Sequence, residues 1–320
     1  MKSSLSALMM IALALSVTAD AKAQSYPNGP VTLIVPYPPG GQIDSLARMV
    51  QQKLQPMLGQ PVVVENRPGG GGNLGTAQAL RSAPDGHTFV LTTDGVMTLN
   101  PFLYPNVGFD PAAATPLTLS TETVVGVAVH NSVPAKNIPE LIAYAKANPG
   151  KVTFGTSGAP QQIIGEMLNR LGGVQMQHVP YKGVALAMTD LVGGHINVVV
   201  ATITSILPHV GSGSIRVVGV SGKERFKQLP DVQAIAETYP EIVVATWSGF
   251  FAPPGTPKAV ADRLSADLIK AIKEKDIVDK LAKTAETVVA TSPAEARARL
   301  KADSDRWANY LKQVTIKLAQ

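Results

Sequence analysis

The stretch VPYPPGGQIDSLAR, from Val35 to Arg48, joins an apolar segment to a helical pattern through a turn with two glycines. Glycine leaves backbone N–H groups accessible, and a helix start offers free N–H groups and the positive end of its dipole. These are the parts of a small-anion site. They are equally the parts of an ordinary strand-to-helix turn, in which Asp44 only stabilises the first helical turn. Spacing alone leaves both interpretations open for Gly40, Gly41 and Asp44.

The same alternation of β-type and helical segments extends over the whole chain. Apolar, β-branched runs begin at Val31, Pro61, His87, Val124, Lys151, Gln175, His195, Ser214 and Val243. We expect helices to begin near Ile43, Asn73, Pro139, Gln161, Ala185, Thr204, Pro257 and Pro293. Thr256 and Ser292 each precede a proline as candidate helix caps, and Ser292 with Glu295 forms a capping box. This order is typical of α/β proteins with mainly parallel sheets.

The first residues predict a secretory signal peptide. MKSSLSALMMIALALSVTADAKAQ carries an early Lys2, an apolar run from Leu5 to Val17 and the ending Ala21-Lys22-Ala23. That run is too short to span a bilayer, and the small residues suit a signal peptidase. We therefore expect residues 1–23 to be a secretory signal peptide, with cleavage after Ala23.

Composition excludes several classes of function. The chain has 320 residues, 45% hydrophobic and 16% charged, which is the composition of a globular protein of one large or two smaller domains. It contains no cysteine, so disulfides, thiolate catalysis and cysteine-ligated metals are excluded. Its net charge of +5 comes from scattered lysines and arginines, without the basic runs of nucleic-acid-binding proteins. Mild basicity suits an acidic small ligand.

Two further turns place small polar residues between a strand and a helix. FGTSGAPQQ, from Phe154 to Gln162, offers the hydroxyls of Thr156 and Ser157, which either bind a ligand or cap the following helix. TTDGVMTLNP puts Thr93 and Asp94 at the end of another strand. Two such turns in different halves of the chain would suit a carboxylate-bearing ligand held from both sides.

A fourth glycine-rich turn imitates a cofactor motif. RPGGGGNLGTAQAL contains the spacing Gly70-x-Gly72-x-x-Gly75, with Asp94 downstream, which formally matches a dinucleotide-binding fingerprint. Runs of glycine produce this pattern by chance, and an exported protein would rarely meet NAD. We expect no cofactor here.

Signatures of enzymes and metal sites are scarce. The sequence contains no G-x-S-x-G, H-E-x-x-H or P-loop motif. Its five histidines show no i, i+4 pairing, so we interpret them as strand-end or surface residues rather than metal ligands. A catalytic triad assembled from distant positions stays open, but a non-enzymatic binding protein is the better hypothesis.

A succession of short strings gives a more specific indication. PYPPGGQIDSLAR, VVVENRPGGGGNLGTAQAL, APDGHT, LNPFLY, HVPYKG and FFAPPGTP occur in this order over essentially the whole mature chain. The chain thereby resembles the extracytoplasmic solute receptors of tripartite tricarboxylate transporters, the Bug-type family. The resemblance implies a type II periplasmic-binding-protein fold: two α/β domains joined by crossing strands, with the ligand cleft between them. It also implies a small organic carboxylate as ligand and a membrane transporter as partner.

The resemblance also suggests domain bounds and site residues. Segments TVVGVAVH and EIVVATWSGFFAP are candidates for the crossing strands, which gives domain 1 at 24–123 and 246–320 and domain 2 at 124–245. In such receptors a carboxylate is held by the loop after the first strand and by small polar residues of the second domain. The ligand-binding residues implied on this chain are Tyr37, Gly40, Gly41, Gln42, Asp44, Thr93, Asp94, Thr156, Ser157, Gln162 and Thr202.

The chain departs from the family pattern at the ligand-facing positions. It has Gln162-Ile163 where the family often has His-Leu, and Ala201-Thr202 where an Asp-Asn pair is frequent. Asp94 stands where small hydroxyl residues are frequent. We expect a monomeric, non-enzymatic periplasmic receptor without cofactor or metal. The alternatives are an exported α/β hydrolase or isomerase, and a sensory carboxylate receptor for a signalling partner.

Overall fold

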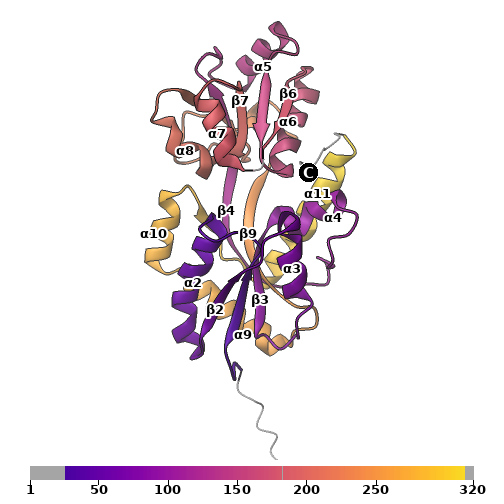
Figure 1. The fold of residues 1–320 in the computed structure, drawn as a ribbon, viewed down its shortest axis with the longest axis vertical. Helices are drawn as coiled ribbons and strands as arrows, with labels where there is room; N and C mark the ends of the chain where they lie inside the picture. Colours follow the sequence, from indigo (N-terminus) through magenta and orange to yellow (C-terminus); the bar gives the residue numbers. More distant parts are fainter. Residues whose placement is uncertain (1–25, 182, 314–320) are drawn as a thin grey trace, which may run out of the picture.

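The structure is a computed structural model that describes residues 26–181 and 183–313. The predicted signal peptide and its cleavage after Ala23 lie outside these residues. No helix among the described residues is both long and apolar enough to cross a bilayer. Figure 1 shows two lobes, one above the other, joined at a waist by two long strands.

The first lobe is built on a parallel sheet with helices on its faces. Strand β1 (Val31–Val35) pairs in parallel with β2 (Val62–Asn66) on one side and β3 (Thr88–Thr93) on the other. Helices α2 (Gln42–Leu58), α3 (Asn73–Leu80) and α9 (Lys258–Ile272) cover this sheet. β1 lies between two strands and under helices, which explains why its sequence VTLIV is almost uniformly apolar.

The second lobe repeats this construction. Strand β5 (Thr153–Thr156) pairs in parallel with β6 (Gln177–Pro180) and β7 (Val198–Thr202). Strand β8 (Ile215–Val220) pairs antiparallel with the second half of the long strand β4 (Thr115–His130). The helices of this lobe are α5 (Ile138–Ala147), α6 (Ala159–Gly172), α7 (Val184–Val192) and α8 (Ile203–Val210), together with the short η3 (Ile235–Glu237).

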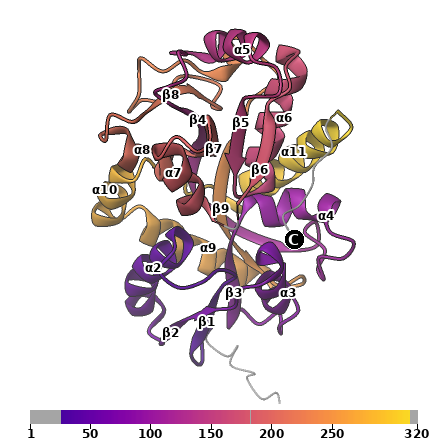
Figure 2. The same cartoon turned by 45° about the horizontal axis from the view of Figure 1, so that its top comes forward.

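The two crossing strands carry the chain between the lobes (Figure 2). β4 (Thr115–His130) pairs antiparallel with β9 (Ala245–Ala252) from Thr115 to Val124, and β9 continues the first-lobe sheet by pairing with β3. From Val125 onward β4 pairs with β7 and β8 of the second lobe. The strand order is therefore β2-β1-β3-β9-β4-β7-β5-β6. The two-lobe fold predicted from the sequence is confirmed.

Two details of the predicted strands were wrong. Parallel pairing holds within each lobe, but β4 and β9 pair antiparallel with every strand they contact. Strand β4 also begins nine residues before the predicted Val124, at Thr115. Its early part, TPLTLSTET, is rich in Thr and Ser, and these side chains bond β9 and the segments that follow β9, α10 (Lys275–Lys283) and β10 (Thr287–Val288).

The last third of the chain ties the lobes together. Helix α11 (Pro293–Leu311) packs Ala296 and Leu300 in a first-lobe cluster, whereas Trp307 and Tyr310 pack in the main core of the second lobe. Helix α10 (Lys275–Lys283) and strand β10 (Thr287–Val288) lie at the waist, where β10 pairs with β4. The helix α10 was not predicted.

Predicted helix starts agree with the observed ones within two residues. The capping box of Ser292 and Glu295 at α11 is confirmed. The predicted cap at Thr256 was wrong, since its hydroxyl donates backward to the Pro253 carbonyl at 2.8 Å and Pro257 occupies the cap position of α9. Four short helices of the described residues were also missed: η1 (Gly70–Gly72), η2 (Gly95–Leu99), α4 (Asn100–Leu103) and η3 (Ile235–Glu237).

Helix α6 approaches β5 closely because of one glycine. A Cβ added to Gly165 would lie 2.2 Å from Cε2 of the buried Phe154 on β5. Ser157 and Gly158, which precede this helix, lie at the waist.

We predict that Gly165→Ala lowers the free energy of unfolding by about 1–3 kcal/mol, because overpacking outweighs the gain in helix propensity. Gly211→Ala is the matched control, since that glycine has right-handed helical backbone angles and open space around it. Urea unfolding of both variants checks this. A Gly165→Ala protein as stable as its control would contradict the proposed packing.

Candidate functional site

A cavity of about 730 Å³ lies between the two lobes. Its wall combines residues from strand ends of both lobes with residues of the crossing strands. First-lobe members include Pro36, Tyr37, Gln42, Gly69, Gly71, Gly72, Thr93, Asp94, Asn100 and Tyr104. Second-lobe members include Thr156, Ser157, Gly158, Gln161, Gln162, His178, Tyr181 and Thr202, and the crossing strands add Thr121, Thr123, Thr246, Trp247 and Ser248.

The structure brings together most of the residues expected at the site. Eight line the cavity: Tyr37, Gln42, Thr93, Asp94, Thr156, Ser157, Gln162 and Thr202. Gly40, Gly41 and Asp44 are not among its lining residues. The turn that first suggested an anion site therefore contributes its flanks, Tyr37 and Gln42, rather than its glycines.

Asp44 holds this turn in place instead of facing the cavity. Its carboxylate accepts hydrogen bonds from the Gly40 N–H at 2.9 Å, from Asn66 Nδ2 at 2.9 Å and from Arg48 Nε at 3.0 Å. Burial raises its pKa, but these bonds outweigh burial and bring the pKa of Asp44 down to about 2. The Gly40 amide is thus engaged within the protein, at a φ of 83° that favours glycine. The interpretation of Asp44 as a residue stabilising the turn is the one that its contacts support.

Two first-lobe strand ends present a pair of hydroxyls to the cavity. The Tyr37 hydroxyl and Thr93 Oγ1 lie 2.7 Å apart, joining the loop after β1 to the end of β3. Burial raises the pKa of Tyr37 to about 12, although the bond to Thr93 opposes the shift. Both groups are therefore neutral at physiological pH, and since one of them donates to the other, one O–H of the pair is free to donate to a ligand.

The second lobe contributes neutral polar groups around the start of α6. Thr156 Oγ1 lies 2.8 Å from His178 Nε2, and burial lowers the pKa of the His178 imidazole, which favours its neutral form. Gly158 is the cap residue of α6 and offers no side chain to the first free N–H groups of the helix. The exposed Ser157 hydroxyl and the buried Gln162 complete this side.

Sequence reasoning missed His178 and the crossing-strand hydroxyls. His178 was interpreted as a strand-end residue, which it is, but its strand ends at the cavity. Thr121 and Ser248 bond each other at 2.8 Å, and Ser248 Oγ lies 2.7 Å from Ser120 Oγ. The clustering of Thr and Ser in both crossing segments was the available signal.

The glycine turn that imitates a dinucleotide motif also lines the cavity. Gly71 and Gly72 have positive φ, and a Cβ on Gly72 would lie 2.7 Å from Val96. A Cβ on Gly71 would meet the Tyr104 hydroxyl at 2.7 Å. The glycines are therefore explained by backbone conformation and close packing, without a nucleotide.

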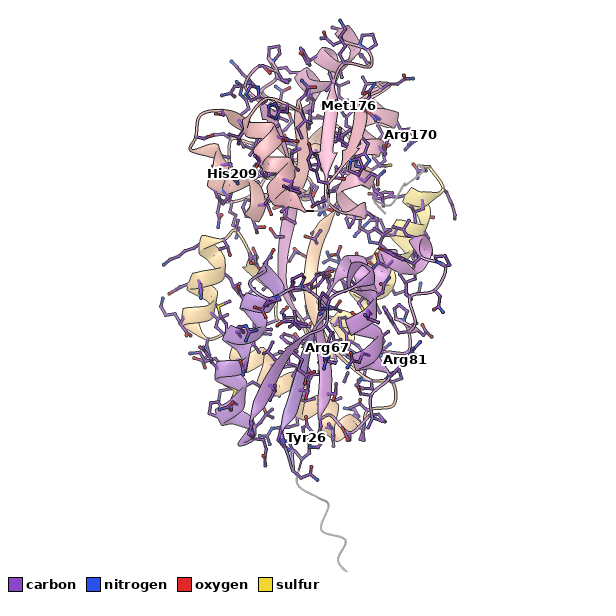
Figure 3. All side chains as sticks on the ribbon, viewed as in Figure 1. Tyr26, Arg67, Arg81, Arg170, Met176 and His209 are labelled. Carbon is purple, nitrogen blue, oxygen red and sulfur yellow. The ribbon has the colours of Figure 1, made fainter. Side chains whose placement is uncertain are left out.

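Charge in the cavity wall is sparse. Among the described lining residues Asp94 is the one carboxylic acid, and neither lysine nor arginine occurs. No cluster of three or more His, Asp or Glu residues suited to a metal ion is found in residues 26–181 and 183–313. A second hollow of about 460 Å³ lies on the second lobe at Arg170 and Met176 (Figure 3), away from the waist. Its lining comes from one lobe and the end of α11, so we place the candidate site between the lobes.

Two α/β lobes, two crossing strands and a polar cavity at the waist define the class of bilobal solute-binding proteins. The chain matches the tripartite tricarboxylate transporter family receptors over residues 46–316 and belongs to this family. The Bordetella pertussis protein BugT is 31% identical over 307 residues, covering 94% of each chain.

Solved structures agree with this assignment. The periplasmic binding protein BugD is 32% identical, with a TM-score of 0.76 over 90% of this chain and 98% of BugD. MatC from Rhodopseudomonas palustris, solved with bound malate, is 28% identical, with a TM-score of 0.77 over 89% and 100% of the chains. R. palustris Rpa4515, solved with adipate, is 29% identical, with a TM-score of 0.80 over 90% and 97%.

We predict that Asp44→Asn lowers the free energy of unfolding at pH 7 by about 1–2 kcal/mol. Since the pKa of Asp44 is lowered in the folded protein, its contribution is present above about pH 4 and is lost as the pH falls toward 2. Urea unfolding at pH 7 and pH 3 should therefore show a smaller effect at pH 3. The control Asp279→Asn removes an exposed ion-pair partner on α10 and should change stability by less than about 0.5 kcal/mol. An equal loss for both variants would refute the role of Asp44.

Proposed function

We propose that this protein captures a small organic carboxylate between its two lobes and delivers it to a membrane transporter of the tripartite tricarboxylate type. The observation that carries the proposal is a cavity lined from both lobes by neutral hydrogen-bond donors, next to a helix start without a side-chain cap. The relatives solved with malate and adipate support a carboxylate as the ligand class.

We assign recognition of the carboxylate to neutral groups. The free O–H of the Tyr37–Thr93 pair would hold it from the first lobe, and Thr156, Ser157 and the first N–H groups of α6 from the second. Hydrogen bonds to an ionised acceptor are about twice as strong as neutral ones, so several such donors can replace a cation. Neutral donors also avoid the cost of burying a lysine or arginine in the empty receptor.

We further propose the finer features of this receptor. The protein is a monomer in the periplasm, where it arrives after cleavage of its signal peptide behind Ala23. It has no catalytic activity and no nucleic-acid partner. The domain bounds 24–123 with 246–320, and 124–245, are supported by the change of partners along β4 after Val124. A sensory role and a hydrolase or isomerase activity are the weaker alternatives, because the family consists of transporter receptors.

A thermal-shift screen tests the carboxylate proposal. Binding to the folded protein alone adds roughly 2.7 kcal/mol at a hundredfold excess of ligand over Kd. We therefore expect a matching mono- or dicarboxylate to raise Tm by about 5 °C. The corresponding amide should not raise it, because it lacks the ionised acceptor.

A matched pair of variants tests whether the carboxylate binds in the cavity. Ser157→Ala removes an exposed hydroxyl from the cavity wall, so affinity should fall about tenfold. Ser45→Ala removes an exposed hydroxyl on α2 outside the cavity and should bind as the unchanged protein does. If amides stabilise as well as the acids do, or if both variants bind alike, the proposal is wrong.

A further inference from the structure

The cavity wall contains one buried acid that the capture of a carboxylate does not require. Asp94 follows the last residue of β3 and precedes η2, and its exposed fraction is 4%. It makes no ion pair within 4 Å in the described parts of the chain, and its side chain does not cap η2. Its carboxyl group is hydrogen-bonded by the backbone N–H groups of Gly95 and Trp247. A buried carboxyl group that has no ion-pair partner and lines a ligand cavity is a candidate for ligand selection.

The groups around Asp94 come from three elements. Helix α11 brings Asp303 and Arg306, the first part of β9 brings Trp247, and the loop after β1 brings the Tyr37 hydroxyl. The negative charge of Asp303 is balanced by an ion pair with Arg306 at 2.8 Å. Its carboxylate also accepts a hydrogen bond from Trp247 Nε1 at 2.6 Å.

The remaining elements that pack on η2 add no charge there. The first turn of α6 presents Ala, Pro and Gln residues, and α4 presents Asn100. His178, across the cavity on β6, is the other titratable side chain of the second-lobe wall, apart from the Tyr181 phenol. Asp94 is therefore not matched by a cation that lines the cavity in the described structure.

We propose that Asp94 selects ligands that carry one carboxylate and, at the far end, a hydrogen-bond donor such as an ammonium or hydroxyl group, over ligands with a second carboxylate. This inference rests on the proposed function, because the neutral donors hold the ligand's carboxylate. An ionised Asp94 would accept a hydrogen bond from the far end of the ligand and would repel a second carboxylate placed there.

The selection should depend on pH near neutrality. Burial, and then the charge of Asp303, raise the pKa of Asp94 to about 7, although the Gly95 and Trp247 backbone bonds and Arg306 oppose the shift. Above this pKa the ionised group favours an ammonium. Below it, the neutral acid no longer repels a carboxylate and can donate a hydrogen bond to it. Affinity for an amino acid ligand therefore rises with pH, whereas affinity for a diacid falls.

Calorimetric titration of a matched ligand series tests this. The series pairs ω-amino acids and ω-hydroxy acids with diacids of equal length: 4-aminobutanoate with succinate, 5-aminopentanoate with glutarate, and 6-aminohexanoate with adipate. Each is titrated at pH 6 and pH 8, with correction for ligand ionisation. The proteins are the unchanged chain, Asp94→Asn, and the control Asp262→Asn, which removes one exposed carboxylate on α9.

At pH 8 the unchanged protein and the control should bind the best amino or hydroxy acid at least tenfold more tightly than the diacid of the same length. At pH 6 this preference should fall to threefold or less. Asp94→Asn should abolish both the preference and its dependence on pH. Diacids preferred at pH 8, or a ranking unchanged in Asp94→Asn, would overturn the role of Asp94 and leave the carboxylate receptor intact. If no carboxylate of the series or of the thermal-shift screen binds, the proposed function itself fails, and this inference fails with it.

Discussion

The antiparallel pairing of β4 with β9 is the interaction on which the rest of the structure depends. It joins the two lobes, and it sets the cavity at the place where β4 exchanges β9 for β7 and β8. Arg299 of α11 reinforces this pairing, since it bonds Glu122 of β4 at 2.9 Å and Asp303 on its own helix at 2.9 Å. Asp303 in turn accepts the Trp247 indole N–H. One helix thereby links both crossing strands to a residue of the cavity wall.

The position of the cavity explains its chemistry. Parallel strands end at the same edge of each lobe's sheet, so the ends of β1 and β3 face the ends of β5 and β7 across the waist. These ends supply hydroxyls, amides and free N–H groups. The crossing strands pass the waist beside the cavity, and their Thr and Ser side chains bond one another there. The result is a polar cavity of low charge, in which a single acid such as Asp94 has a large influence.

The sequence was sufficient to predict the fold, and eight of the eleven residues predicted for the site line the cavity. Sequence patterns predicted those features that depend on neighbouring residues. The capping box at Ser292 predicted the start of α11, and glycine turns predicted strand-to-helix junctions. The order of motifs predicted the two-lobe family fold, which composition and periodicity alone leave undetermined.

The wrong or missing predictions concern residues whose roles depend on contacts with residues distant in sequence. Asp44 turned out to bond Asn66, 22 residues away, and this partner is not visible in a helix-start pattern. His178 reaches the cavity because β6 pairs with β5 and ends beside Thr156. The first half of β4 is polar and lacks the apolar pattern by which a strand is predicted. Its side chains make their hydrogen bonds with β9 and with the segment after α10, which are distant in sequence.

A crystal structure of the protein with a carboxylate identified by the thermal-shift screen would show whether both lobes hold one carboxylate through neutral donors at the waist. The account predicts ligand density in the cavity, with contacts to Tyr37 or Thr93 on one side and to Thr156, Ser157 or the start of α6 on the other. A carboxylate bound outside this cavity, or held there by one lobe alone, would contradict it.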